Sequence, residues 1–146
     1  MIQTLYRLII YFFSKFIKTD SLSDKFPVSV KAIIIDDNKV LCLKNERNEW
    51  DLAGGKINFN EDIEESLKRE VKEETNLNIN NFNILKPVNL TFNDVSVIVL
   101  IYSVNISCDS PIIISYEHSE YNFFSKSEVM NLNLPQYYKN LIEGLI

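Results

Sequence analysis

Residues 55–77, GKINFNEDIEESLKREVKEETNL, set the expected fold. Asn60 can cap a helix that runs from about residue 61 to residue 75, because a short polar side chain accepts hydrogen bonds from the first free amides of a helix. A helix turns about 100° per residue, so apolar side chains three and four positions apart form one stripe that faces the core. The expected stripe consists of Ile63, Leu67 and Val71.

Three glutamates near the end of this predicted helix occupy unfavourable positions: Glu70, Glu73 and Glu74. Glu70 and Glu74 fall within about 40° of the apolar stripe, on the side that should be buried. Carboxylates one turn apart repel each other, resist desolvation and oppose the negative end of the helix dipole. Arg69 can neutralise one of them. Oxygen ligands clustered in this way are what Mg²⁺ or Mn²⁺ prefers.

The segments around this helix predict one mixed α/β domain, because strand-like and helix-like runs are interspersed along the chain. Ser125 and Glu128 form a capping-box pattern for a short helix, and Pro135 suits the first turn of a last helix. A loop that contains Trp50 leads into the central stretch. Apolar and β-branched runs predict strands at 28–35, 40–43, 84–90, 95–106 and 112–115.

The spacing of glycine and charged residues over 55–77 resembles the Nudix box, a signature of 23 positions. The resemblance rests on the first glycine, on Glu61 and on residues 69–77, and residues 50–52 are also similar to the family. It implies the Nudix α/β/α sandwich, with a mixed sheet between helices, over residues 25–146. A long spaced pattern of this kind is far more specific than a single glycine motif.

Two positions differ from the family pattern. Asn76 stands where the box has its last glycine, and Ala53 stands where many relatives have proline. The position of Asn76 ends the helix and calls for a left-handed backbone, where asparagine is the best substitute for glycine. Neither difference removes an acidic residue.

The resemblance implies a metal-dependent hydrolase that cuts a phosphoanhydride bond in a nucleoside diphosphate linked to another group. The implied cofactor is Mg²⁺ or Mn²⁺. The positions that match the family's metal ligands are the Gly54 carbonyl, Glu70, Glu73 and Glu74. The resemblance also implies that Arg69 holds these carboxylates in place, whereas Glu61 is expected to be structural.

Several members of the family recruit one more glutamate from a distant loop, and residues 117–124 resemble that loop. Glu117 is the first choice for this additional metal-binding and catalytic group, and Glu120 is the second. His118 is the one histidine of the chain. A single histidine in a polar loop is more often structural than catalytic, and we expect that here.

The implied substrate is a nucleoside triphosphate or a similar small nucleotide, which the short chain favours. ADP-ribose and nucleotide sugars are the alternatives within the hydrolases. A non-catalytic nucleotide-binding sensor of the same fold would be expected to lack acids of the box, and this chain has them all. An isomerase of isoprenoid diphosphates would need a further cysteine and glutamate in characteristic contexts, which the sequence does not show.

Composition narrows the possible partners and the compartment. The net charge of −5 argues against nucleic-acid polymers as partners, because phosphate backbones are bound by basic surfaces. The chain of 146 residues has room for one domain with a substantial core. Cys42 and Cys108 lie far apart in apolar runs, which predicts buried, reduced thiols in a cytoplasmic protein.

Residues 1–24 predict an amphipathic helix followed by a polar linker. The apolar residues of this segment lie three and four positions apart, and Arg7 interrupts them. The stretch is too short to span a membrane, which needs about 20 apolar residues. We expect the apolar face to pack on the domain or to form a homodimer, with contact to a membrane surface as the less favoured alternative.

Overall fold

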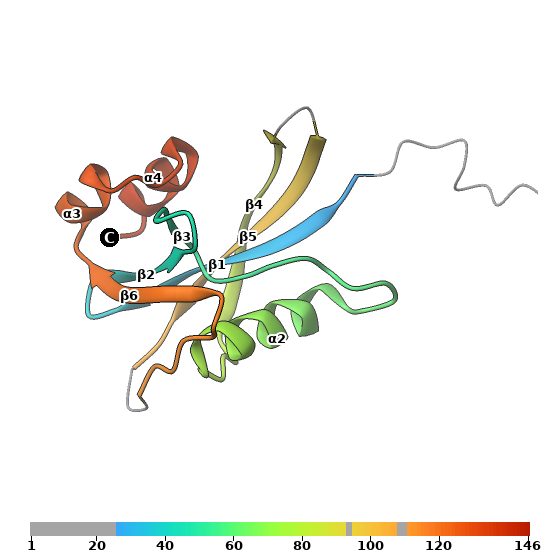
Figure 1. The fold of residues 1–146 in the computed structure, drawn as a ribbon, viewed down its shortest axis with the longest axis horizontal. Coiled ribbons are helices and arrows are strands. Elements are labelled where there is room, and N and C mark those ends of the chain that lie inside the picture. Colours follow the sequence, from blue (N-terminus) through green and yellow to red (C-terminus); the bar gives the residue numbers. More distant parts are fainter. Residues whose placement is uncertain (1–25, 93–94, 108–110) are drawn as a thin grey trace, which may run out of the picture.

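The computed structural model of the protein describes residues 26–92, 95–107 and 111–146 (Figure 1). Its strands are β1 (Val28–Asp36), β2 (Lys39–Asn45), β3 (Trp50–Asp51), β4 (Phe82–Phe92), β5 (Val95–Asn105) and β6 (His118–Phe124). Its helices are α2 (Ile63–Thr75), α3 (Lys126–Asn131) and α4 (Gln136–Glu143). The strands form one sheet in the order β3-β2-β1-β5-β4, and β6 pairs with β2.

Helices cover both faces of this mixed sheet, as the sequence predicts. Strand β1 is parallel to β5 and antiparallel to β2. Successive side chains of a strand point to opposite faces. Ile34 therefore packs with Leu67 and Val71 of α2, whereas its neighbour Ile33 packs with Ile142 of α4 on the other face. Figure 1 shows α2 on one side of the sheet and α3 and α4 on the other.

Helix α2 begins two residues later than predicted. Its N-cap is Asp62, whose Oδ1 accepts from the amides of Glu64 at 2.9 Å and Glu65 at 3.3 Å. Asn60, the predicted cap, has a φ of 63° and lies in the turn before the helix. Ile63 was expected in the buried stripe, but it is 41% exposed because the buried part of the helix starts only at Ser66.

The end of α2 agrees with the prediction from the sequence. Asn76 is the C-cap, with a left-handed φ of 62°, and its amide donates to the Lys72 carbonyl. The two shorter helices also begin where expected. In α3, the Ser125 amide donates to Glu128 Oε2 at 2.8 Å, and Pro135 is the residue immediately before α4.

Residues 112–115 do not form the predicted strand. The amides of Ile113 and Ser115 instead donate to the carbonyls of Thr75 and Glu74 at the end of α2. The four last carbonyls of a helix have no partner within the helix, so this segment satisfies two of them. This run therefore binds the C-terminal end of α2 and does not extend the sheet.

Residues 118–124, which were predicted as part of a loop, form strand β6. The pairing with β2 runs from Val40 opposite Phe124 to Asn45 opposite His118. Trp50, also predicted in a loop, begins the two-residue strand β3. Both segments pair with β2, which therefore organises this end of the sheet.

The remaining predictions concern the two cysteines and the N-terminal segment. Cys42 is fully buried, as expected, and burial raises the pKa of its thiol to about 12. The predicted helix and linker at 1–24 and Cys108 lie outside the described residues. Within the described ranges, no helix is long and apolar enough to cross a membrane.

Candidate functional site

The segment around Gly54 passes close to β1 and reaches the end of α2. The carbonyls of Ala53 and Gly55 accept from the amides of Ala32 and Val30 at 2.8 and 2.9 Å. Gly54 between them has a φ of 131°, and a Cβ at this position would overlap the Val30 carbonyl. Only glycine fits this backbone conformation and this close approach. The segment can therefore bring a backbone amide against the inner face of α2.

The Glu74 carboxylate accepts a hydrogen bond from that amide. The amide of Gly54 donates to Glu74 Oε2 at 2.7 Å, and Glu74 is only 9% exposed. Burial raises the pKa of Glu74 to about 7, although the positive charge of Lys31 and the hydrogen bond from Gly54 act in the opposite direction. The predicted inward position of Glu74 is confirmed. A buried carboxylate with a raised pKa is a common feature of functional sites.

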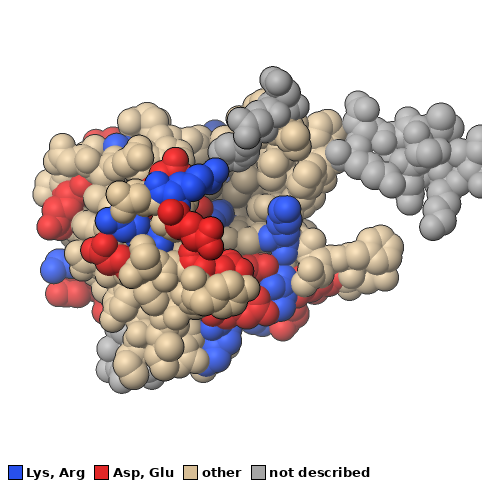
Figure 2. Space-filling view, viewed as in Figure 1, with Lys and Arg blue, Asp and Glu red and all other residues tan. Residues whose placement is uncertain are grey.

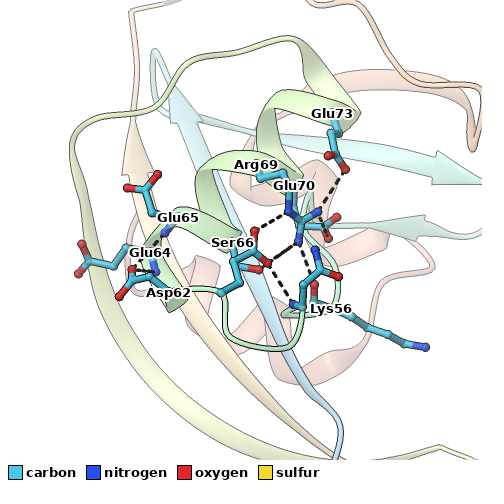
Figure 3. Close-up of polar contacts among 10 residues, drawn as sticks. Lys56, Asp62, Glu64, Glu65, Ser66, Arg69, Glu70 and Glu73 are labelled. Atoms are coloured by element: carbon cyan, nitrogen blue, oxygen red, sulfur yellow. Dashed lines mark hydrogen bonds and ion pairs between the residues drawn. The ribbon is translucent and has the colours of Figure 1, made fainter.

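Arg69 binds two more carboxylates of α2 and one from the turn before the helix (Figure 3). Its Nη1 lies 2.7 Å from Glu70 and 3.2 Å from Glu73, and its Nε lies 2.6 Å from Glu61. Its Nη2 also donates to the Lys56 carbonyl at 3.2 Å. The hydrogen bond from Arg69 lowers the pKa of Glu61 to about 2. The predicted pairing of Arg69 with carboxylates is confirmed.

Glu70 lies against the second glycine of the segment. A Cβ on Gly55 would overlap the Glu70 carboxylate, so the missing side chain leaves the space that this carboxylate fills. Glu70 has 14% of its side chain exposed, whereas Glu73 has 59%. Figure 2 shows acidic side chains gathered at the centre of the face in view, with lysine and arginine side chains beside them.

The donor atoms fit a hard divalent cation, but they do not already converge on one point. Among the described residues, no three acidic, histidine or cysteine side chains are grouped as a ready metal site. Glu70 and Glu73 instead share Arg69, and Glu74 is turned to Gly54. Within the same ranges, no hydrogen bond uses the Gly54 carbonyl. Three carboxylates and a free carbonyl are oxygen ligands of the kind that Mg²⁺ takes.

Glu117 lies in the turn before β6, far from α2 in the sequence, but hydrogen bonds tie this turn to the end of α2. The turn is closed by the His118 amide, which donates to the Ser115 carbonyl at 3.1 Å, and the Ser115 amide binds the Glu74 carbonyl at 3.2 Å. The Glu117 side chain is exposed. Glu120, the alternative, pairs with Lys44 of β2 at 3.2 Å. The structure thus ties the turn of Glu117 to α2 and pairs Glu120 with β2.

His118 faces the buried carboxylate. Its Nε2 lies 3.8 Å from Glu74 Oε1, and its Nδ1 lies 3.3 Å from the Ser115 hydroxyl. Burial and then the charge of Lys31 lower the pKa of His118, while Glu117 acts in the opposite direction. A structural role is expected for His118 from the sequence, which carries no sign of its contact with Glu74. That contact depends on the turn at the end of α2, which no local pattern predicts.

A pocket of about 820 Å³ lies on the side of the sheet that α3 and α4 cover, because its wall includes Val99, Leu134 and Tyr138 of that core. Its wall includes Trp50, Asp51 and Lys56, which belong to the same segment as the two glycines. None of the three helix carboxylates lines the pocket, so this segment separates the pocket from the carboxylates. The pocket is lined by Pro27, Ser29, Lys31, Asn45, Arg47, Glu49, Trp50, Asp51, Lys56, Thr91, Val95, Val97, Val99, Asn133, Leu134, Pro135 and Tyr138.

Lys31 was not predicted as a site residue, although the sequence carries a sign of it. It is the one charged residue in the predicted strand at 28–35, whose other residues except Ser29 are apolar. Its Nζ donates to Asp51 Oδ2 and to the Leu52 carbonyl, both at 2.8 Å. A lysine at the centre of a buried strand therefore joins the pocket wall to the segment that approaches Glu74.

Comparisons with known proteins agree with this geometry. The NUDIX domain family profile matches residues 25–145. The MutT protein from Methanosarcina mazei superposes with a TM-score of 0.72 and 31% identity, over 83% of this chain and 94% of that one.

Two curated relatives match over shorter stretches. The ADP-ribose pyrophosphatase of Methanocaldococcus jannaschii is 43% identical over 54 residues, which are 34% of this chain and 32% of that protein. The 8-oxo-dGTP diphosphatase of Buchnera aphidicola subsp. Schizaphis graminum is 36% identical over 67 residues, 42% of this chain and 52% of that protein. The chain thus spans about a third and about half of these two relatives.

Proposed function

The chain belongs to the Nudix family of pyrophosphohydrolases, and we propose that it hydrolyses a phosphoanhydride bond of a nucleoside triphosphate or a similar small nucleotide. The observation that carries the proposal is the buried Glu74 carboxylate, held by the Gly54 amide next to Glu70 and Glu73 of the same helix. Members of this family typically use a divalent metal. Because the chain has a net charge of −5, a cation is also needed between its carboxylates and a polyphosphate.

In this proposal Glu70, Glu73, Glu74 and the Gly54 carbonyl hold Mg²⁺ or Mn²⁺. When bound, the cation neutralises phosphate oxygens and makes a water molecule more acidic. Arg69 keeps Glu70 and Glu73 on one side of α2, and the Gly54 amide fixes the orientation of Glu74. Holding charged groups in place before the reaction lowers the cost of reorganising them during it.

Glu117 is our candidate for the general base. It would take a proton from the attacking water, whose oxygen forms a new bond to one phosphorus. The bond from that phosphorus to the bridging oxygen breaks, and its electron pair leaves with the other phosphate group. The products are a nucleoside monophosphate and the remaining phosphate portion. The reaction needs no covalent intermediate with the protein.

In this proposal the nucleoside portion occupies the pocket, which the glycine segment separates from the carboxylates. Its volume of about 820 Å³ lies within the range of roughly 300–1,000 Å³ that small-molecule sites occupy. Trp50 and Tyr138 contribute aromatic surface to the wall, and Asn133 contributes an amide group that can both donate and accept. Lys56, with an exposed side chain, lies where phosphates would pass from the pocket to α2.

The purified protein should release a nucleoside monophosphate from at least one nucleotide in a panel, and EDTA should abolish the release. The panel contains the canonical and 8-oxo-purine dNTPs, ADP-ribose, dinucleoside polyphosphates and nucleotide sugars, each with Mg²⁺ and with Mn²⁺. Chromatography of the nucleotides together with phosphate and pyrophosphate assays identifies which bond is cut. A preference for ADP-ribose would replace the triphosphate proposal. Binding without metal-dependent turnover of any compound would show a nucleotide sensor.

The assignment of Glu117 predicts a difference between two nearby acids. Glu117→Gln should lower kcat by about 10²-fold or more, because a general base contributes roughly 10²–10⁴-fold. Its effect on KM should be small. Glu120→Gln is the matched control on the same segment and should cost less than about threefold, because a surface ion pair such as its pair with Lys44 contributes little. Steady-state kinetics decide the order, and the reverse ranking would transfer the role to Glu120.

A further inference from the structure

Lys31 is an unusual residue for its place in the fold. It lies in the middle of β1, between Val30 and Ala32, which are both fully buried, and its own side chain is only 15% exposed. Burying an ammonium group has a desolvation cost of several kcal/mol that its partners must offset. An apolar residue would form the same strand without that cost. The position of the charge therefore calls for an explanation beyond packing.

The partners of Lys31 indicate what the charge does. Its ammonium group binds both the Asp51 carboxylate and the Leu52 carbonyl at 2.8 Å, which fastens two consecutive residues to β1. The Gly54 amide that binds Glu74 at 2.7 Å follows two residues later. The Ala53 carbonyl between them is held by the Ala32 amide. The Val30 amide binds the Gly55 carbonyl, so three consecutive residues of β1 hold the segment that approaches Glu74.

We propose that Lys31 is a positioning residue for Glu74: by binding Asp51 and Leu52, it keeps the Gly54 amide directed at the Glu74 carboxylate. This inference rests on the proposed function, in which Glu74 holds the metal. Lys31 acts through the backbone of the segment before Gly54 and does not itself touch the reacting atoms. Loss of a group that orients a metal ligand without binding the metal typically lowers metal affinity or activity by about 10- to 100-fold.

The direct test is amide hydrogen exchange at Gly54 in the metal-free protein. The chain has three glycines, so labelling with ¹⁵N-glycine gives few NMR signals and lets Gly54 be followed alone. Lys31→Met keeps a side chain of similar length but removes its charge. Amide exchange at Gly54 should become faster by roughly tenfold or more. Lys31→Arg, which retains two donors, should restore most of the protection. Lys86→Met, at an exposed lysine of β4, is the control and should change nothing.

Metal affinity and kinetics separate positioning from other roles. In Lys31→Met, Mn²⁺ affinity measured by electron paramagnetic resonance should fall about 10- to 100-fold. The kcat should fall by a similar factor and KM should change little. A rise in KM alone would show that Lys31 binds substrate directly and would overturn the proposal. A lower melting temperature with unchanged Gly54 exchange and Mn²⁺ affinity would show a purely structural role and would overturn it too.

A second variant covers the case in which Lys31→Met does not fold, because it leaves Asp51 without its partner. Lys31→Met combined with Asp51→Asn removes both charges, keeps an acceptor for the Leu52 amide, which binds Asp51 Oδ1 at 2.7 Å, and should fold. It should still exchange fast at Gly54, because the Leu52 carbonyl has lost its donor; normal protection would refute the positioning role. If the wild type hydrolyses nothing but Gly54 exchange responds to Lys31 as predicted, the proposed function fails and the structural link stands.

Discussion

Glu74→Gln should lower kcat by at least about 10²-fold, while the metal-free protein becomes no less stable than the wild type. The activity falls because an amide oxygen is a far weaker ligand for a divalent cation than a carboxylate. Stability is kept because the glutamine oxygen can still accept from the Gly54 amide, which now binds Glu74 at 2.7 Å. The substitution also removes a charge that burial disfavours, and this gain should be about 0.5–1 kcal/mol.

Thermal unfolding with and without Mg²⁺ gives the matching measurement. Mg²⁺ should raise the melting temperature of the wild type, because a ligand that binds the native state stabilises it. The variant should lose most of that increase. Glu64→Gln is the control, because Glu64 is an exposed acid in the first turn of the same helix. If Glu74→Gln destabilises the metal-free protein and Mg²⁺ still raises its melting temperature normally, Glu74 is a structural residue.

The central helix could be predicted from sequence because its information is local. Leu67 and Val71 face the core as their spacing requires, and both are fully buried. The same periodicity places Glu74 on the inner side, where the structure finds it. The left-handed conformation of Asn76 follows from the need to end the helix. Each of these inferences needs only neighbours within a few residues.

The start of the same helix could not be predicted because two local signals compete. Asn60 and Asp62 are both good caps, and their intrinsic preferences differ little. Glu61, between them, binds Arg69 two turns into the helix and also accepts from the Asn58 amide at 3.0 Å. These contacts hold residues 58–61 in a turn, so the helix starts at the second cap. The ion pair between Glu61 and Arg69, eight residues apart, thus determines where α2 begins.

The C-terminal part of the sheet was harder to predict from the sequence than the start of the helix. An apolar run and a polar run follow each other at 112–124, and apolar composition favours a strand in the first. The structure places the first run on the end of α2 and the second on β2. An edge strand can be polar because both of its faces are partly exposed, as β6 is. The aromatic residues Tyr121, Phe123 and Phe124 were the local sign of that strand.

The site beyond the helix depends on contacts that no spacing reveals. Lys31 and Asp51 are 20 residues apart, and Glu74 and His118 are 44 apart by their numbers. The sequence supplies the charged groups, but the antiparallel approach of the glycine segment to β1 brings them together. The helix acids of the candidate site were therefore predictable, whereas the supports around them were not.

Alanine substitutions at the two adjacent glycines should separate folding from chemistry. Gly54→Ala should destabilise the protein by more than about 3 kcal/mol, because its Cβ would overlap the backbone of β1 and its φ of 131° is strained for alanine. Gly55→Ala meets only the end of the flexible Glu70 side chain. Its cost in stability should be about 1 kcal/mol or less. Its activity should nevertheless fall by about 10²-fold, because the Glu70 carboxylate is displaced.

Chemical denaturation and steady-state kinetics measure the two effects on the same preparations. The Gly55→Ala variant should also need more Mg²⁺ for half-maximal activity, which a general loss of stability would not cause. Gly55→Ala combined with Glu70→Asp is the corresponding rescue, because the shorter acid leaves room for the new methyl group and should recover part of the metal response. If Gly55→Ala is fully active at ordinary Mg²⁺ concentrations, the position of Glu70 against this glycine has no part in metal binding, and the assignment of Glu70 as a ligand would have to be withdrawn.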